Sequence, residues 1–202
     1  MDKKGLKGIA VTDHNTIEGG KVAQKQADRD HIIIVGSEVK TEIGDIIGLF
    51  LTNEIRSRKS MEVLDEIQAQ NGISVLAHPF RTPYMFRFRH RRVDSYDPEF
   101  MQKVNLIEIT NARSKSRENL RARELAERFG KPVSAGSDAH FLPEIGSARL
   151  VLKGQKIEME NDIKECLLSG MTETQRGRVF FNNFHWYVMT ALTSYWHKVT
   201  ER

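Results

Sequence analysis

Apolar and polar residues alternate in blocks along the chain, and these blocks predict strands and helices in turn. Short apolar runs, several rich in β-branched residues, predict strands at 8–12, 31–35, 43–51, 73–77, 104–109, 133–135 and 148–152. The segments between them predict helices at 18–28, 60–70, 116–129 and 161–168, with Ser60 placed to cap the second helix. Strands alternating with helices of this length indicate βα units and a largely parallel sheet, in which 43–51 could pair with the strand before it.

The last part of the chain departs from this rhythm. Trp186, Met189, Leu192, Trp196 and Val199 fall at helical spacing, which predicts an amphipathic helix over 183–198. Its aromatic residues could mark a partner or membrane surface, but such a stripe more often packs on its own domain.

The composition is that of one soluble globular domain: 202 residues, 39% hydrophobic and 29% charged. No apolar stretch approaches the roughly 20 residues that a membrane-spanning helix needs, and the polar N-terminus has no apolar secretory segment. The single cysteine, Cys166, excludes an internal disulfide and is interpreted as a small core residue. We therefore expect a cytoplasmic protein without a membrane partner.

The net charge of +4 is modest, but the basic residues are clustered at 81–92 and 113–123. Such clusters suit anionic partners, either phosphates or nucleic acid. In the first cluster Tyr84, Phe86 and Phe88 are interleaved with arginines, which could supply base stacking. The alternative is a solvated loop and an exposed helix face.

Residues of the types that bind metals occur where the predicted strands end. They are Asp13 and His14, then Glu38, then His78, then Glu108 and Asn111, then Asp138 and His140. The carboxyl ends of parallel strands lie on one face of a sheet or barrel, so we expect these side chains to converge. Carboxylates and imidazoles in one cleft form a ligand set for Zn, Mn or Fe. A lone histidine at such a place is usually structural, but this many coincidences point to a metal site.

Four short segments, in order and spacing, resemble the motifs of the PHP (polymerase and histidinol phosphatase) family of phosphoesterases. They are Thr12-Asp13-His14-Asn15-Thr16, Gly36-Ser37-Glu38, Ala77-His78-Pro79-Phe80-Arg81, and Gly136-Ser137-Asp138-Ala139-His140 followed by Glu144-Ile145-Gly146. The resemblance covers 5–155 of a single domain, 1–202, with 156–202 as a C-terminal helical region. It implies an α/β fold, a distorted (β/α)7 TIM-like barrel with two or three divalent metal ions at its C-terminal rim.

The resemblance also implies roles for individual residues. By motif, the metal ligands are His14, Glu38, His78, Asp138 and His140. Asp13 is expected to orient a ligand or a water molecule. Glu108 and Asn111 stand where some members place another ligand, so a third metal position is left open.

One family motif has no counterpart here. The family opens with a strand bearing a His-x-His pair, tens of residues before the Thr-Asp-His motif, which in this chain already begins at Thr12. We therefore expect the barrel to be open where its first strand belongs. Either the chain is an N-terminal truncation or the protein lacks the strand. The five retained ligand-type residues favour truncation, which could impair the activity of this chain.

The implied function is metal-dependent hydrolysis of phosphate esters, on a small phosphorylated metabolite or a nucleotide. Arg81 and Arg113 are expected near the rim, where they either grip the phosphate or pair with carboxylates. The alternatives are a nucleic-acid binding or processing module, a degenerate scaffold without catalysis, and a deaminase-like hydrolase with similar ligands. An exposed barrel seam or the aromatic helix could drive self-association.

Overall fold

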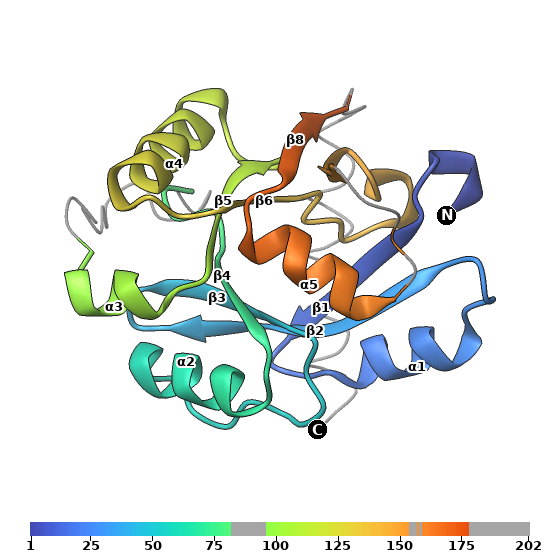
Figure 1. The fold of residues 1–202 in the computed structure, drawn as a ribbon, viewed down its shortest axis with the longest axis horizontal. Helices are drawn as coiled ribbons and strands as arrows, with labels where there is room; N and C mark the ends of the chain where they lie inside the picture. Colours follow the sequence, from blue (N-terminus) through green and yellow to red (C-terminus); the bar gives the residue numbers. More distant parts are fainter. Residues whose placement is uncertain (82–95, 154–156, 158, 178–202) are drawn as a thin grey trace, which may run out of the picture.

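The computed structural model describes residues 1–81, 96–153, 157 and 159–177, which fold around a six-stranded curled sheet (Figure 1). In spatial order the sheet contains β1 (Gly8–His14), β2 (Ile32–Thr41), β3 (Gly44–Leu49), β4 (Ile73–Leu76), β5 (Leu106–Asn111) and β6 (Val133–Gly136). A second, antiparallel pair contains β7 (Ala148–Leu152) and β8 (Thr172–Arg176). The helices are α1 (Glu18–Gln26), α2 (Ser60–Ala69), α3 (Pro98–Lys103), α4 (Ser116–Phe129) and α5 (Glu160–Leu168), with short 3-10 turns η1 (Asp2–Lys4) and η2 (Leu142–Glu144). The predicted α/β class is confirmed, whereas the complete (β/α)7 barrel stays a prediction.

Strand directions in the large sheet bring most carboxyl ends to one edge. β1 with β2, β4 with β5, and β5 with β6 pair in parallel, while β3 runs antiparallel to β2 and β4. The reversal arises because only residues 42–43 separate β2 from β3, too few for a crossover. The predicted pairing of this segment with its predecessor is confirmed. The start of β3 consequently lies at the same edge as the ends of the other strands.

Apolar residues on both faces of the sheet are buried, as expected when helices cover both sides. On one face α2, α3 and α4 pack on residues such as Ile46, Leu76 and Ile107, each fully buried. On the other face α5, which crosses in front of the sheet in Figure 1, packs Ile163 and Leu167 in one cluster with Ile73, Val75 and Leu106. Nearer the carboxyl ends of the parallel strands, this second face carries Glu38 and Asp45, which share it with Ile47.

Two helices differ from the prediction, one in its first residue and one in being absent from it. Lys59 is the residue before α2, and Ser60 is its first helical residue. The carboxylate of Glu42, in the β2–β3 turn, accepts hydrogen bonds from the Ser60 amide (3.0 Å) and hydroxyl (2.5 Å). The helix α3 was not predicted, although its signal is present: the Asp97 side chain accepts from the Glu99 amide at 2.9 Å, and proline follows Asp97 at once.

Two strands also differ from the prediction. β2 continues past 35 to Thr41, because the hairpin with β3 gives these polar residues a pairing partner. β8 lies inside the segment that was expected to be helical, where that prediction is wrong. Its sequence is too polar to give a hydrophobic strand signal; its threonines instead bond to the main sheet, with the Thr174 and Thr110 hydroxyls 2.9 Å apart. The predicted helix at 183–198 and the aromatic part of the basic loop lie outside the described residues.

Cys166 lies on α5 and is buried, which confirms its interpretation as a core residue. Within the described ranges, every helix is too short or too polar to cross a membrane.

Candidate metal centre

Three ligand-type side chains meet at the carboxyl edge of the sheet: Glu38 on β2, Asp45 on β3 and His78 after β4. One potential ligand atom from each lies within 4.8 Å of the other two. The His78 Nε2 atom is 3.0 Å from Glu38 Oε1 and 4.0 Å from Asp45 Oδ2. Carboxylate oxygens and an imidazole nitrogen in this arrangement are a donor set suited to a divalent transition metal.

The hairpin register explains how Asp45 joins this group. Lys40 and Asp45 are direct partners across β2 and β3, so their side chains share a face with Glu38, two residues before Lys40. The strand-end pattern in the sequence does not include Asp45, because this residue stands at the start of a strand and not at a C-terminus. The short turn before Gly44 was the available signal, since an antiparallel strand starts at the edge where its neighbours end.

Glu108 stands behind His78. The Oε2 atom of Glu108 accepts the His78 backbone N–H at 2.8 Å and the Asn111 side-chain amide at 3.1 Å. The His78 backbone has a φ of 25°, a strained conformation that this hydrogen bond helps to hold. Burial raises the pKa of the Glu108 carboxyl. Glu108 thus positions the His78 backbone, and Asn111 in turn holds Glu108. The open third-ligand prediction for both residues remains a prediction.

Asp138, after β6, centres a second group on the same edge. Its Oδ2 atom accepts from the Arg81 guanidinium and, at 3.3 Å, from the Asn111 amide. His140 Nδ1 lies 3.6 Å from Asp138 Oδ1. Glycine is required at position 136 of the motif because a Cβ there would collide with the Glu108 carboxylate. The Asn111 side-chain amide donates to the carboxylates of both Glu108 and Asp138, and so links the two groups.

The remaining predicted residues lie around these groups. His14, at the end of β1, places Nδ1 3.7 Å from Glu38 Oε2 with most of its side chain exposed. Asp13 is exposed and turns toward α1, where a side chain in place of Gly19 would collide with its carboxylate. The Arg113 Nη2 atom donates to both oxygens of Glu144, at 3.1 and 3.2 Å. The fold thus gathers the predicted residues at one edge, in two linked groups with Asp13 and Arg113 at the periphery.

The electrostatics of Glu38 and His78 suit a bound cation. Burial of Glu38 raises its pKa, but the hydrogen bond and charge of His78, with charges from His14 and Arg81, outweigh this and leave the pKa lowered. Burial of His78 lowers its pKa, but the hydrogen bond to Glu38 and the charges of Glu108 and Glu38 leave it raised. The neighbouring carboxylates thus favour the protonated form of His78. A metal cation can replace that proton, so the residues fit the metal that the sequence predicts.

This exchange gives a pH-dependent prediction. Because the pKa of His78 is raised above 6.5, metal affinity should rise with pH across and beyond that value, by up to about tenfold per pH unit. The metal-free protein has the opposite trend: the stabilisation due to the His78 proton is present below 6.5 and is lost as pH rises through the raised pKa. Calorimetric titration with Mn²⁺ between about pH 6 and 8 checks the first trend. A flat affinity profile would contradict proton exchange at His78.

Comparisons with known proteins find a matching family segment and a relative. Residues 116–172 match the PHP-associated family, PHP_C. An uncharacterized protein of Methanocaldococcus jannaschii, MJ0417, is 34% identical in an alignment of 161 positions that covers 76% of this chain and 61% of that protein. The chain therefore spans about three fifths of the length of this relative.

Solved structures share the fold. A two-domain protein of Bacteroides vulgatus that contains a predicted PHP-like metal-dependent phosphoesterase superposes with a TM-score of 0.69 at 16% identity, over 86% of this chain and 57% of that one. A proposed metal-dependent phosphoesterase of Bifidobacterium adolescentis gives 0.55 at 12% identity, over 89% of both chains. At these identities the likeness establishes the fold. Together with the matched PHP-associated segment, this likeness supports membership of the PHP family.

Proposed function

We propose that this chain hydrolyses phosphate esters of small phosphorylated metabolites or nucleotides with the help of two or three divalent metal ions. The observation that carries the proposal is the convergence of Glu38, Asp45 and His78 within 4.8 Å, on the edge that also holds Asp138 and His140. Two proteins that share the fold are named for metal-dependent phosphoesterase activity, which supports the same reaction class.

In this proposal the chain's own residues hold the ions and the phosphate. Glu38, Asp45 and His78 hold one ion, while Asp138, His140 and His14 complete the metal-binding edge. A bound ion supplies a water molecule of lowered pKa as nucleophile and a positive charge beside the phosphate oxygens. Glu108 fixes the His78 backbone and Asn111 fixes the Asp138 carboxylate, which keeps the ligands in place.

The Asp45→Asn variant tests this proposal. Purified chain should release nitrophenol from p-nitrophenyl phosphate or from the bis-nitrophenyl diester when supplied with Mn²⁺, Zn²⁺ or Fe²⁺, and the variant should lose roughly 10- to 100-fold in kcat/KM. Asp65→Asn is the matched control, because Asp65 is an exposed α2 residue that pairs with Lys103. The proposal fails if the chain binds metal yet cleaves neither ester, or if both variants keep wild-type rates.

A further inference from the structure

Lys40 lies on the metal-centre face of the β2–β3 hairpin. It follows Glu38 by two residues on β2, so the two side chains leave the strand on the same face. It also stands directly opposite Asp45 in the register. Since β2 runs toward the carboxyl edge, Lys40 is farther out than Glu38, and it is exposed.

The backbone that carries Lys40 is held firmly. The next residue, Thr41, donates its hydroxyl hydrogen to the Gly44 carbonyl at 2.6 Å and so closes the hairpin turn. Glu42 then ties the turn to the first turn of α2 through the Ser60 amide and hydroxyl. The base of the lysine side chain is thus fixed, while its flexible stem lets the ammonium group reach toward the centre.

Lys40 differs from the other cations of this edge in having no carboxylate to neutralise it. Arg81 pairs with Asp138, and Arg113 pairs with Glu144. Among the described residues Lys40 forms neither a hydrogen bond nor an ion pair, not even with Asp45 across the hairpin. Its ammonium group remains available to an anion bound at the centre.

We propose that Lys40 is a substrate-binding residue, whose ammonium group holds a phosphate oxygen of the substrate beside the Glu38–Asp45–His78 group. This inference rests on the proposed function and adds to it. A dianionic phosphate gains more from this second positive charge than a monoanionic diester does, so Lys40 favours phosphate monoesters.

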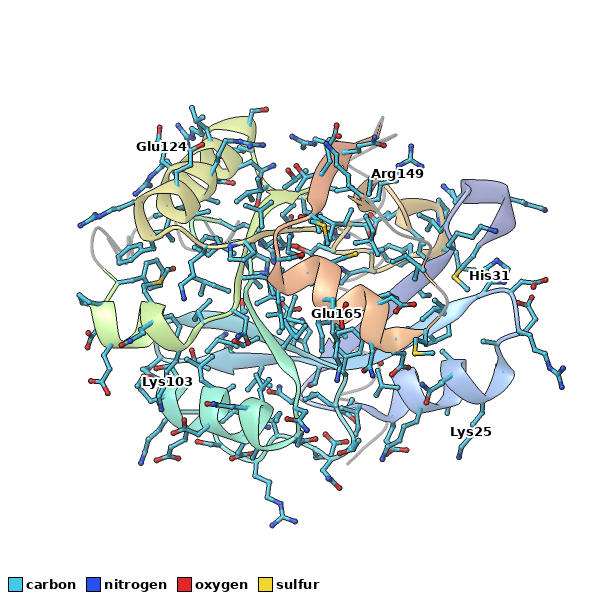
Figure 2. The ribbon with its side chains drawn as sticks, viewed as in Figure 1. Lys25, His31, Lys103, Glu124, Arg149 and Glu165 are labelled. Carbon is cyan, nitrogen blue, oxygen red and sulfur yellow. The ribbon has the colours of Figure 1, made fainter. Side chains whose placement is uncertain are left out.

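Phosphate binding to the metal-loaded chain tests this assignment without requiring turnover. Inorganic phosphate is titrated calorimetrically into the Mn²⁺-loaded wild type and into Lys40→Gln, Lys40→Arg and Lys25→Gln. Lys40→Gln should weaken phosphate binding about 10-fold with unchanged metal stoichiometry, and Lys40→Arg should retain most of the affinity. Lys25→Gln removes the same charge from the exposed end of α1, where Figure 2 shows Lys25 pointing away from the sheet, and should leave the affinity unchanged.

The possible results separate this inference from the proposed function. Equal phosphate affinity in the wild type and Lys40→Gln would overturn the role of Lys40 and leave the phosphoesterase proposal standing. An equal loss in Lys25→Gln would also overturn it, since the effect would then come from net charge rather than contact. If the wild type binds Mn²⁺ but no phosphate, both proposals fail.

Discussion

Replacing Glu38 with glutamine is expected to weaken binding of divalent metal by roughly 100-fold or more, because even the outer partners of metal ligands are worth 10- to 100-fold. Glu38 lies between His14 and His78, and its side chain is only 13% exposed. The substitution keeps the shape of the side chain but removes the negative charge that attracts the cation. Calorimetric titration with Mn²⁺ and Zn²⁺, together with plasma mass spectrometry of the purified chain, measures the loss.

A control variant at a second glutamate, Glu62, separates the loss of a metal ligand from the loss of one negative charge anywhere on the protein. Glu62→Gln makes the same chemical change on the exposed face of α2, where Glu62 pairs with Lys59, and should leave metal affinity at the wild-type value. The double variant His78→Ala, Asp138→Ala removes a ligand from each of the two groups and should be free of metal. Wild-type affinity in Glu38→Gln would show that metal, if bound, is held elsewhere.

Gly36→Ala should lower the free energy of unfolding by about 1–3 kcal/mol, the usual cost of forcing a methyl group into a packed interior. A Cβ at position 36 would lie 2.6 Å from the Gly48 carbonyl oxygen and 2.9 Å from Thr12 Cγ2. Both β1 and β3 are hydrogen-bonded to β2 here, so neither backbone can move away without loss of sheet pairing. This close approach explains why the motif that presents Glu38 begins with glycine.

Urea unfolding of the metal-free chain measures this difference in the free energy of unfolding. The melting temperature should fall by roughly 2–4 °C for each kcal/mol lost in a chain of this size. Gly177→Ala is the matched control, because its added methyl would meet the Ser147 carbonyl oxygen at 3.4 Å, an ordinary contact. Unchanged stability in Gly36→Ala would mean that the strands separate more easily than their pairing indicates.

The elements predicted well are those with strong local signals. The helix predicted at 116–129 is α4, with both ends in place, because its capping signals and periodic apolar residues all lie within one segment. The strands ending near His14, His78 and Asp138 were likewise found from compact apolar runs. Where the strand is polar and depends on pairing with another strand, as for the second half of β2 and for β8, the prediction failed or stopped short.

The residues of the site likewise fall into those that the sequence indicates and those that only the tertiary structure brings in. The sequence by itself determined the α/β class and which ligand-type residues stand at the strand ends, because order along the chain and strand direction are enough for both. Only the tertiary structure brought in Asp45, turned Glu108 behind His78 and paired Arg81 and Arg113 with carboxylates. These outcomes depend on the antiparallel register of β3 and on contacts between residues about 30 or more positions apart, and local sequence patterns do not encode either.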